Sequence, residues 1–183
     1  MTEKKQIASR YDASAEVYDA RYTDIQHQKY SEILSRVAVF ENNQIIDIGC
    51  GTGIFLGLLT ELMKEDYFKP LVGIDLSYEM IKIAHSKFPD VDFIVADSDN
   101  LPLKENSFDR IFSVTHLQNL PDPNTTVNEM NRIAQNKALL AISILRKTWT
   151  QDRLREVVDQ NNFIVEDEWI ARVEDIGVLC NKP

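Results

Sequence analysis

Short runs of apolar, mostly β-branched residues alternate along the chain with longer segments in which apolar positions recur at helical spacing. The apolar runs predict strands at residues 44–48, 71–75, 91–95, 109–114, 138–144, 163–171 and 174–181. The segments of helical period predict helices at residues 8–22, 26–39, 53–65, 78–87, 124–135 and 149–160. Strands that alternate with helices favour a parallel sheet covered on both faces, so the sequence predicts an α/β fold with a Rossmann-like doubly wound sheet.

The last two predicted strands differ from the others because only a short turn, around residues 172–174, separates them. Such a turn joins antiparallel neighbours, so this pair is expected to form an antiparallel C-terminal hairpin at one edge of a mostly parallel sheet. A chain of 183 residues is most simply one domain. We expect residues 1–183 to form that domain, with a helical lid at residues 1–40 and a core at residues 44–183.

Composition and charge argue against several classes of function. The net charge is −9 and no cluster of lysines and arginines stands out, which argues against direct binding of nucleic acid by this chain alone. No apolar run approaches the roughly 20 residues of a membrane span, and the basic N-terminus lacks the apolar stretch of a secretion signal. Cys50 and Cys180 lie far apart, which predicts neither a metal site nor a disulfide framework and favours a reducing, cytoplasmic setting.

The segment after the first predicted strand carries the strongest indication of chemistry. Asp47 lies near the end of the strand, and glycines follow at every second position, Gly49, Gly51 and Gly53, before a helical pattern begins. Such a turn brings bare backbone close to a ligand, which side chains would block. A dinucleotide fingerprint needs its third glycine three residues after the second, where this chain has Ile54. The stretch therefore resembles motif I of the class I S-adenosylmethionine (SAM) methyltransferases and not a nicotinamide site.

This resemblance covers nearly the whole chain and is to the group often called methyltransferase type 11. It implies a seven-stranded sheet, with SAM as cofactor and S-adenosylhomocysteine (SAH) as product. The glycine turn, including Cys50, would wrap the methionine half of the cofactor, and Asp47 would accept a hydrogen bond from its ammonium group. Asp75, 22 residues after Gly53, is placed to hold the ribose hydroxyls, with Leu76 against the adenine. The alternatives are a glycine turn without a ligand and, for Asp75, an acid favoured by a helix N-terminus.

Two further segments follow in the order of the family's motifs. Asp97 and Ser98 come after the third strand, where an acid can accept a hydrogen bond from the adenine amine, although a solvated turn is the alternative. Ser113 lies where the fourth strand leads into a loop that, in the family, passes under the methionine. His116 in this loop is the candidate catalytic residue, with simple packing as the alternative, since many relatives carry their histidines two and three residues later.

The N-terminal segment matches the family's opening segment, which folds over the cofactor. Tyr18 is the predicted cofactor contact in this segment, with Tyr11 and Tyr22 as weaker candidates. Packing is the alternative explanation of an aromatic stripe at helical spacing. Asp12 and Asp19 are further candidate bases.

The sequence thus predicts a SAM-dependent methyltransferase that aligns an acceptor, a small molecule being favoured, for in-line displacement. The alternative is a partner-dependent or non-catalytic SAM-binding subunit of a larger methyltransferase complex acting on RNA or protein, in which a small activator subunit adds a strand to an exposed sheet edge. A nicotinamide oxidoreductase is least favoured, because no Tyr-x-x-x-Lys pair follows the fourth strand. Neither a metal nor a membrane partner is expected.

Overall fold

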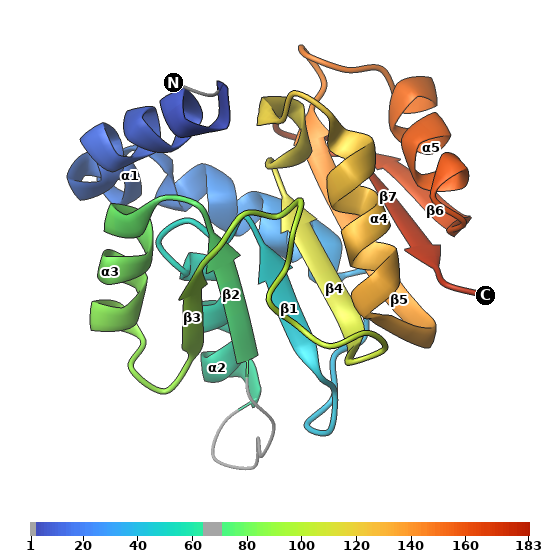
Figure 1. Cartoon of the computed structure of the whole chain (residues 1–183), viewed down its shortest axis with the longest axis horizontal. Helices are drawn as coiled ribbons and strands as arrows, with labels where there is room; N and C mark the ends of the chain where they lie inside the picture. Colours follow the sequence, from blue (N-terminus) through green and yellow to red (C-terminus); the bar gives the residue numbers. More distant parts are fainter. Residues whose placement is uncertain (1–2, 64–70) are drawn as a thin grey trace.

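The computed structural model describes residues 3–63 and 71–183 and contains a seven-stranded sheet between helices (Figure 1). The strands lie in the order β3-β2-β1-β4-β5-β7-β6, and all neighbours are parallel except β7, which is antiparallel to β5 and β6. The strands are β1 (Ile45–Ile48), β2 (Leu71–Asp75), β3 (Asp92–Val95), β4 (Phe108–Val114), β5 (Ala134–Leu145), β6 (Ile164–Ile170) and β7 (Asp175–Asn181). The predicted α/β fold class and its antiparallel C-terminal edge are confirmed.

The helices divide between the two faces of the sheet, and each face has its own apolar core. Consecutive residues of β4 point to opposite cores: Ile111 lies in the core beneath α4 and α5, and Phe112 in the core shared with α1, α2 and α3. The helices are α1 (Glu3–Leu34), α2 (Ile54–Met63), α3 (Tyr78–Lys87), α4 (Pro123–Ile133), α5 (Gln151–Gln160) and the short 3-10 helix η2 (Leu117–Asn119). Strand β1 is buried along its whole length, and its residues other than Asp47 are apolar, as expected for a central strand that is covered on both faces.

Helix α1 is one continuous helix of 32 residues, so the prediction of two helices at residues 8–22 and 26–39 is wrong. Residues 23–25 contain neither glycine nor proline, and the Thr23 hydroxyl donates to the Asp19 carbonyl 2.7 Å away, within the helix. The helix ends at Leu34. Val37 follows in a turn and is buried, so the apolar pattern there reflects packing on the core and not helix.

Other boundaries differ by a few residues. Helix α4 ends at Ile133, two residues before the end of the helix predicted at residues 124–135. Strand β5 begins at Ala134, four residues before the start of the strand predicted at residues 138–144. The end of the predicted helix at residues 53–65 lies outside the described residues. The division of the chain into a lid and a core stays a prediction, but Figure 1 shows α1 lying across the carboxyl ends of the central strands. Ligands of open α/β sheets bind at this edge.

Candidate functional site

A cavity lies at the carboxyl ends of β1, β2 and β4, under α1, and holds about 920 Å³ of empty space including its open mouth. Nine of the eleven predicted cofactor contacts line the cavity: Tyr18, Asp47, Gly49, Cys50, Gly51, Asp75, Leu76, Asp97 and Ser98. The structure therefore brings together residues from four separate motifs.

The glycine turn after β1 has a left-handed backbone at all three glycines. Gly49, Gly51 and Gly53 have φ angles of +82°, +54° and +76°. A Cβ atom on Gly51 would meet no atom within 4 Å, so the turn presents bare backbone to open space there. A Cβ atom on Gly49 would lie 2.4 Å from Cγ of His116, so the histidine ring can pack here only against a glycine.

The two remaining predicted contacts are not among the lining residues. Gly53 directly precedes α2, and a Cβ atom on it would lie 2.7 Å from Cζ of Phe93, so it permits close packing of the helix. Ser113 is buried in β4, and its hydroxyl donates to the carbonyl of Ile48 in β1, 3.1 Å away. Both residues support the strands and the helix that carry the glycine turn.

Two carboxylates dominate the electrostatics of the cavity. Asp47 is 3% exposed, and its Oδ1 atom has no hydrogen-bond partner among the described residues. Burial, reinforced by the charge of Asp75, raises the pKa of Asp47 to about 8. Asp75 accepts hydrogen bonds from the backbone N–H groups of Gly51 (3.0 Å) and Ser77 (2.9 Å), although burial still raises its pKa. The cavity thus combines a fixed carboxylate with one that lacks a partner.

Phenol and amide groups of α1 and the loop after β4 close the cavity from above. The Tyr18 hydroxyl accepts from Gln26 Nε2 at 3.1 Å, and the Tyr11 hydroxyl accepts from Asn119 Nδ2 at 3.1 Å. Burial raises the pKa of Tyr18 to about 12 and also raises the pKa of Tyr11. Both phenols therefore stay protonated and keep an O–H group to donate. Tyr22 is 44% exposed and packs on Tyr18 with ring centroids 4.9 Å apart, outside the lining.

The three candidate bases have different surroundings. His116 lines the cavity, and its Nε2 lies 3.2 Å from the Ser98 hydroxyl. Burial lowers the pKa of His116 to about 4, so its imidazole is neutral at pH 7. Asp12 accepts from the Ser77 hydroxyl and from a backbone N–H group of α3, and Asp19 forms an ion pair with Lys87 at 2.6 Å. Asp12 and Asp19 are not among the lining residues and tie α1 to the core.

Sequence reasoning missed most of the contribution of α1. The helix also supplies five lining residues that were not predicted: Lys4, Ile7, Ala8, Gln26 and Tyr30. With Tyr11 and Tyr18, and apart from the adjacent pair Ile7 and Ala8, they recur at intervals of three, four, seven or eight residues, which is the spacing of one helix face. That spacing could have identified them if the helix had been predicted as continuous. The loop after β4 adds Thr115, Asn119 and Leu120.

Other kinds of site receive no support from the described residues. Residues 3–63 and 71–183 contain no group of three or more histidine, cysteine or acidic side chains placed to hold a metal ion. Cys50 and Cys180 are buried, free thiols. Every helix in the same ranges is too short or too polar to cross a bilayer.

The sheet order, the antiparallel seventh strand and the glycine turn define a class I methyltransferase fold. Among solved structures, the chain is similar to one in the "Complex between the Haloferax volcanii Trm112 methyltransferase activator and the putative methyltransferase". The TM-score is 0.85 and the sequence identity 19%, and the similarity covers 94% of this chain and 97% of that chain. It is also similar to magnesium protoporphyrin IX methyltransferase from Synechocystis with bound SAM, with a TM-score of 0.84 and 14% sequence identity. This similarity covers 100% of this chain and 98% of that chain. These identities establish the fold alone.

The sequence profile of the type 11 methyltransferase domain matches residues 46–142, more than half of the chain. The chain therefore belongs to this family of class I SAM-dependent methyltransferases, and the predicted resemblance is confirmed.

Two curated relatives carry different acceptors in their names. Malonyl-[acyl-carrier protein] O-methyltransferase of Marinomonas is 29% identical over 78% of this chain and 52% of its own length. Ubiquinone/menaquinone biosynthesis C-methyltransferase of Campylobacter jejuni is 30% identical over 75% of this chain and 59% of its own length. The chain thus spans only about half to three fifths of the length of these relatives.

Proposed function

We propose that this chain binds SAM in the cavity under α1 and transfers its methyl group to a small molecule. The observation that carries the proposal is the Oδ1 atom of Asp47, a buried carboxylate oxygen without a partner beside a glycine turn with open backbone. A buried polar atom without a partner is costly, and an ammonium group would satisfy it. The amino-acid end of SAM supplies such a group.

The proposed roles of the other residues follow from their positions in the cavity. Asp75 would hold the ribose hydroxyls with the lone pairs that Gly51 and Ser77 leave free, and Leu76 would lie against the adenine. Asp97 would accept from the adenine amine. Tyr18 accepts a hydrogen bond from Gln26, so its own hydroxyl proton would be free to donate to the ligand.

Catalysis would rest on alignment and on exclusion of water. SAM supplies an electrophilic methyl group, so the chain has to orient the acceptor and keep water out. Helix α1 covers the cavity, which favours a small acceptor over a folded macromolecule. With a pKa of about 4, His116 is a weak base, so we expect an acceptor that is already ionised or that loses its proton with little help.

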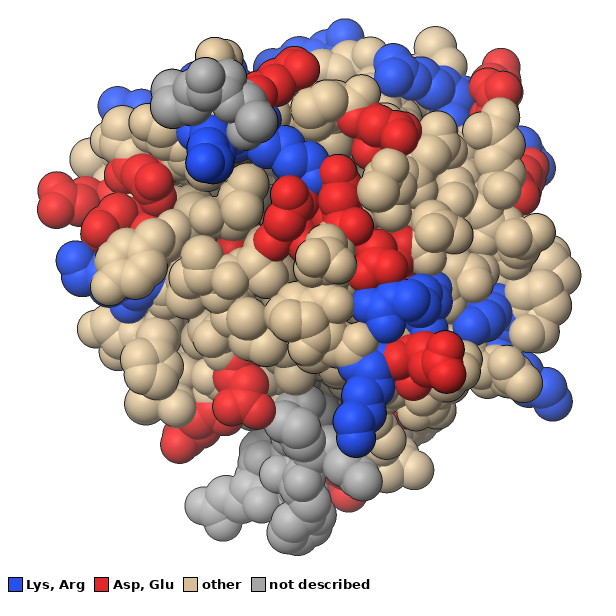
Figure 2. All heavy atoms as spheres, viewed as in Figure 1, with Lys and Arg blue, Asp and Glu red and all other residues tan. Residues whose placement is uncertain are grey.

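A second candidate function is a SAM-binding subunit that needs a protein partner and acts on RNA or protein. The similarity to a chain in an activator complex favours it, as does the exposed apolar surface of the edge strands, Val95 of β3 and Ile164 and Ile170 of β6. Figure 2 shows acidic and basic side chains interspersed on one face. Because the net charge of the chain is −9, an RNA substrate would need basic surface from the partner. A chain that is insoluble alone and soluble only when coexpressed would favour this function.

Calorimetric titration of the purified chain with SAM, SAH and NAD tests the proposal. We expect SAM and SAH to bind and NAD not to bind. Asp75→Asn should abolish binding because an amide offers one acceptor oxygen where the carboxylate offers two. Asp92→Asn removes an exposed carboxylate on β3 and is the matched control, expected to bind like the unaltered chain. Binding of NAD, or equal binding of SAH by both variants, would overturn the proposed site.

A further inference from the structure

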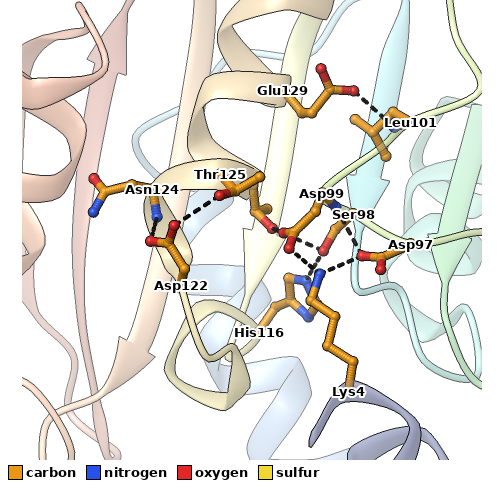
Figure 3. A network of polar contacts seen from close by, with 11 residues as sticks. Lys4, Asp97, Ser98, Asp99, Leu101, His116, Asp122, Asn124, Thr125 and Glu129 are labelled. Carbon is orange, nitrogen blue, oxygen red and sulfur yellow. Dashed lines mark hydrogen bonds and ion pairs between the residues drawn. The ribbon is translucent and has the colours of Figure 1, made fainter. Parts of the chain in front are cut away.

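Lys4, in the first turn of α1, connects this helix to the loop after β3. Its ammonium group forms ion pairs with the carboxylates of Asp97 and Asp99 (Figure 3). The Lys4 side chain is only 15% exposed, and Lys4 also lines the cavity. The Asp97 side chain is 41% exposed, so these ion pairs are only partly shielded from water and remain sensitive to salt.

The ion pairs leave part of Asp97 free for a ligand. Oδ1 of Asp97 accepts hydrogen bonds from the Lys4 ammonium group and from the backbone N–H group of Asp99, the latter at 3.0 Å. Oδ2 has no donor among the described residues that contact Asp97. Lys4 therefore orients this carboxylate and leaves one oxygen to accept from an exocyclic amine.

The far side of the network is fixed to the floor of the cavity. Asp99 accepts from the Thr126 hydroxyl, and Thr126 lies 3.0 Å from the Ser98 hydroxyl, which in turn contacts His116. Figure 3 shows this chain running from Lys4 to the histidine ring.

Helix α4 holds the loop after β3 in place. Glu129 of α4 accepts from the backbone N–H group of Leu101 at 2.8 Å. Arg132 donates to the carbonyls of Leu101 (3.0 Å) and Leu103 (2.8 Å). The partners of Lys4 are thus anchored on the core, so the Lys4 ion pairs fix the start of α1 to the core.

We propose that Lys4 is a positioning residue that latches the first turns of α1 over the nucleoside end of the cavity and so limits the rate at which a bound nucleoside leaves. This inference rests on the proposed SAM site. Ile7, Ala8 and Tyr11 follow Lys4 on the same helix face and line the same cavity. Release of a nucleoside held by Asp97 therefore requires the Lys4 ion pairs to break.

Surface plasmon resonance on the full chain, with SAH and 5′-methylthioadenosine as probes, measures the dissociation rates. Lys4→Gln should raise both rates about fivefold, the loss expected for ion pairs of moderate strength, with a smaller change in the association rate. Lys5→Gln removes an exposed neighbouring charge and should change neither rate. Lys4→Arg, which keeps the charge, should restore slow release. Higher salt should speed release from the unaltered chain and have little effect on Lys4→Gln.

A second variant separates the latch from the folding of α1. Asp99→Asn weakens the same ion pairs from the loop side without altering α1, so it should also speed release, and its effect should not add to that of Lys4→Gln. If the unaltered chain does not bind SAH, the proposed function itself fails. If it binds SAH and Lys4→Gln releases SAH at the same rate, the latch is refuted and the cofactor site stands.

Discussion

Asp47 provides a direct test of the proposed cofactor site, because its carboxyl group has to change charge when a cation binds beside it. The side chain is 3% exposed and Oδ1 has no partner among the described residues. Its pKa is raised to about 8, so about 0.9 of the free protein carries a neutral Asp47 at pH 7. An ammonium group at Oδ1 favours the ionised form, so binding of SAH should release a proton.

The magnitude follows from the raised pKa. With a pKa of about 8, the ionised fraction of Asp47 is about one half at pH 8 and about 0.01 at pH 6. The affinity for SAH should therefore fall about fiftyfold from pH 8 to pH 6, and binding at pH 7 should release about 0.9 proton. Calorimetry in buffers of different ionisation enthalpy counts these protons. 5′-Methylthioadenosine lacks the ammonium group and is the matched ligand, for which we expect no release from Asp47.

Equal proton release by the two ligands, or none by SAH, would refute this account of Asp47. Asp47→Asn should remove the pH dependence and weaken SAH binding.

The raised pKa of Asp47 also determines how the stability of the fold changes with pH. Between about pH 4 and pH 8 the unfolded chain binds fewer protons at Asp47 than the folded chain. The contribution of Asp47 to stability therefore falls as the pH rises. Asp47→Asn should therefore melt at a higher temperature than the unaltered chain at pH 8.

Three further predictions concern two residues that line the cavity and the buried ion pair between Lys29 and Asp175. Gly49→Ala forces a methyl group to within 2.4 Å of the His116 ring on a backbone with φ of +82°, so urea unfolding should show a loss of about 1–3 kcal/mol, and an unchanged midpoint would contradict the packing. Lys29→Met leaves the buried carboxylate of Asp175 without its cation and should cost about 3–5 kcal/mol, part of which Asp175→Asn should restore in the double variant. Tyr18→Phe should weaken SAH binding about threefold to tenfold by calorimetry, and full affinity would exclude the hydroxyl as a contact.

The sheet could be predicted from sequence because its strands are defined by local apolar runs. Strand β1 is fully buried and apolar apart from Asp47, and the short turn before β7 indicated the antiparallel edge. The glycine turn was equally local, since three glycines at fixed spacing permit the left-handed backbone that few other residues adopt. By contrast, Thr115 has a φ of +57° without glycine, held by contacts with Lys29 and Asp175 that are distant in sequence.

Helix α1 explains why much of the site could not be predicted. Its inward face carries Lys4, Tyr11, Tyr18, Gln26 and Lys29, polar residues that a search for apolar periodicity discards. These side chains are polar because they face a cavity and buried carboxylates, not an apolar core. The partners that justify them lie far along the chain, 93 residues away for the ion pair between Lys4 and Asp97. Residues that close a site over a ligand are therefore harder to predict than those that form its floor, because their pattern is set by the ligand and by distant partners and not by the core.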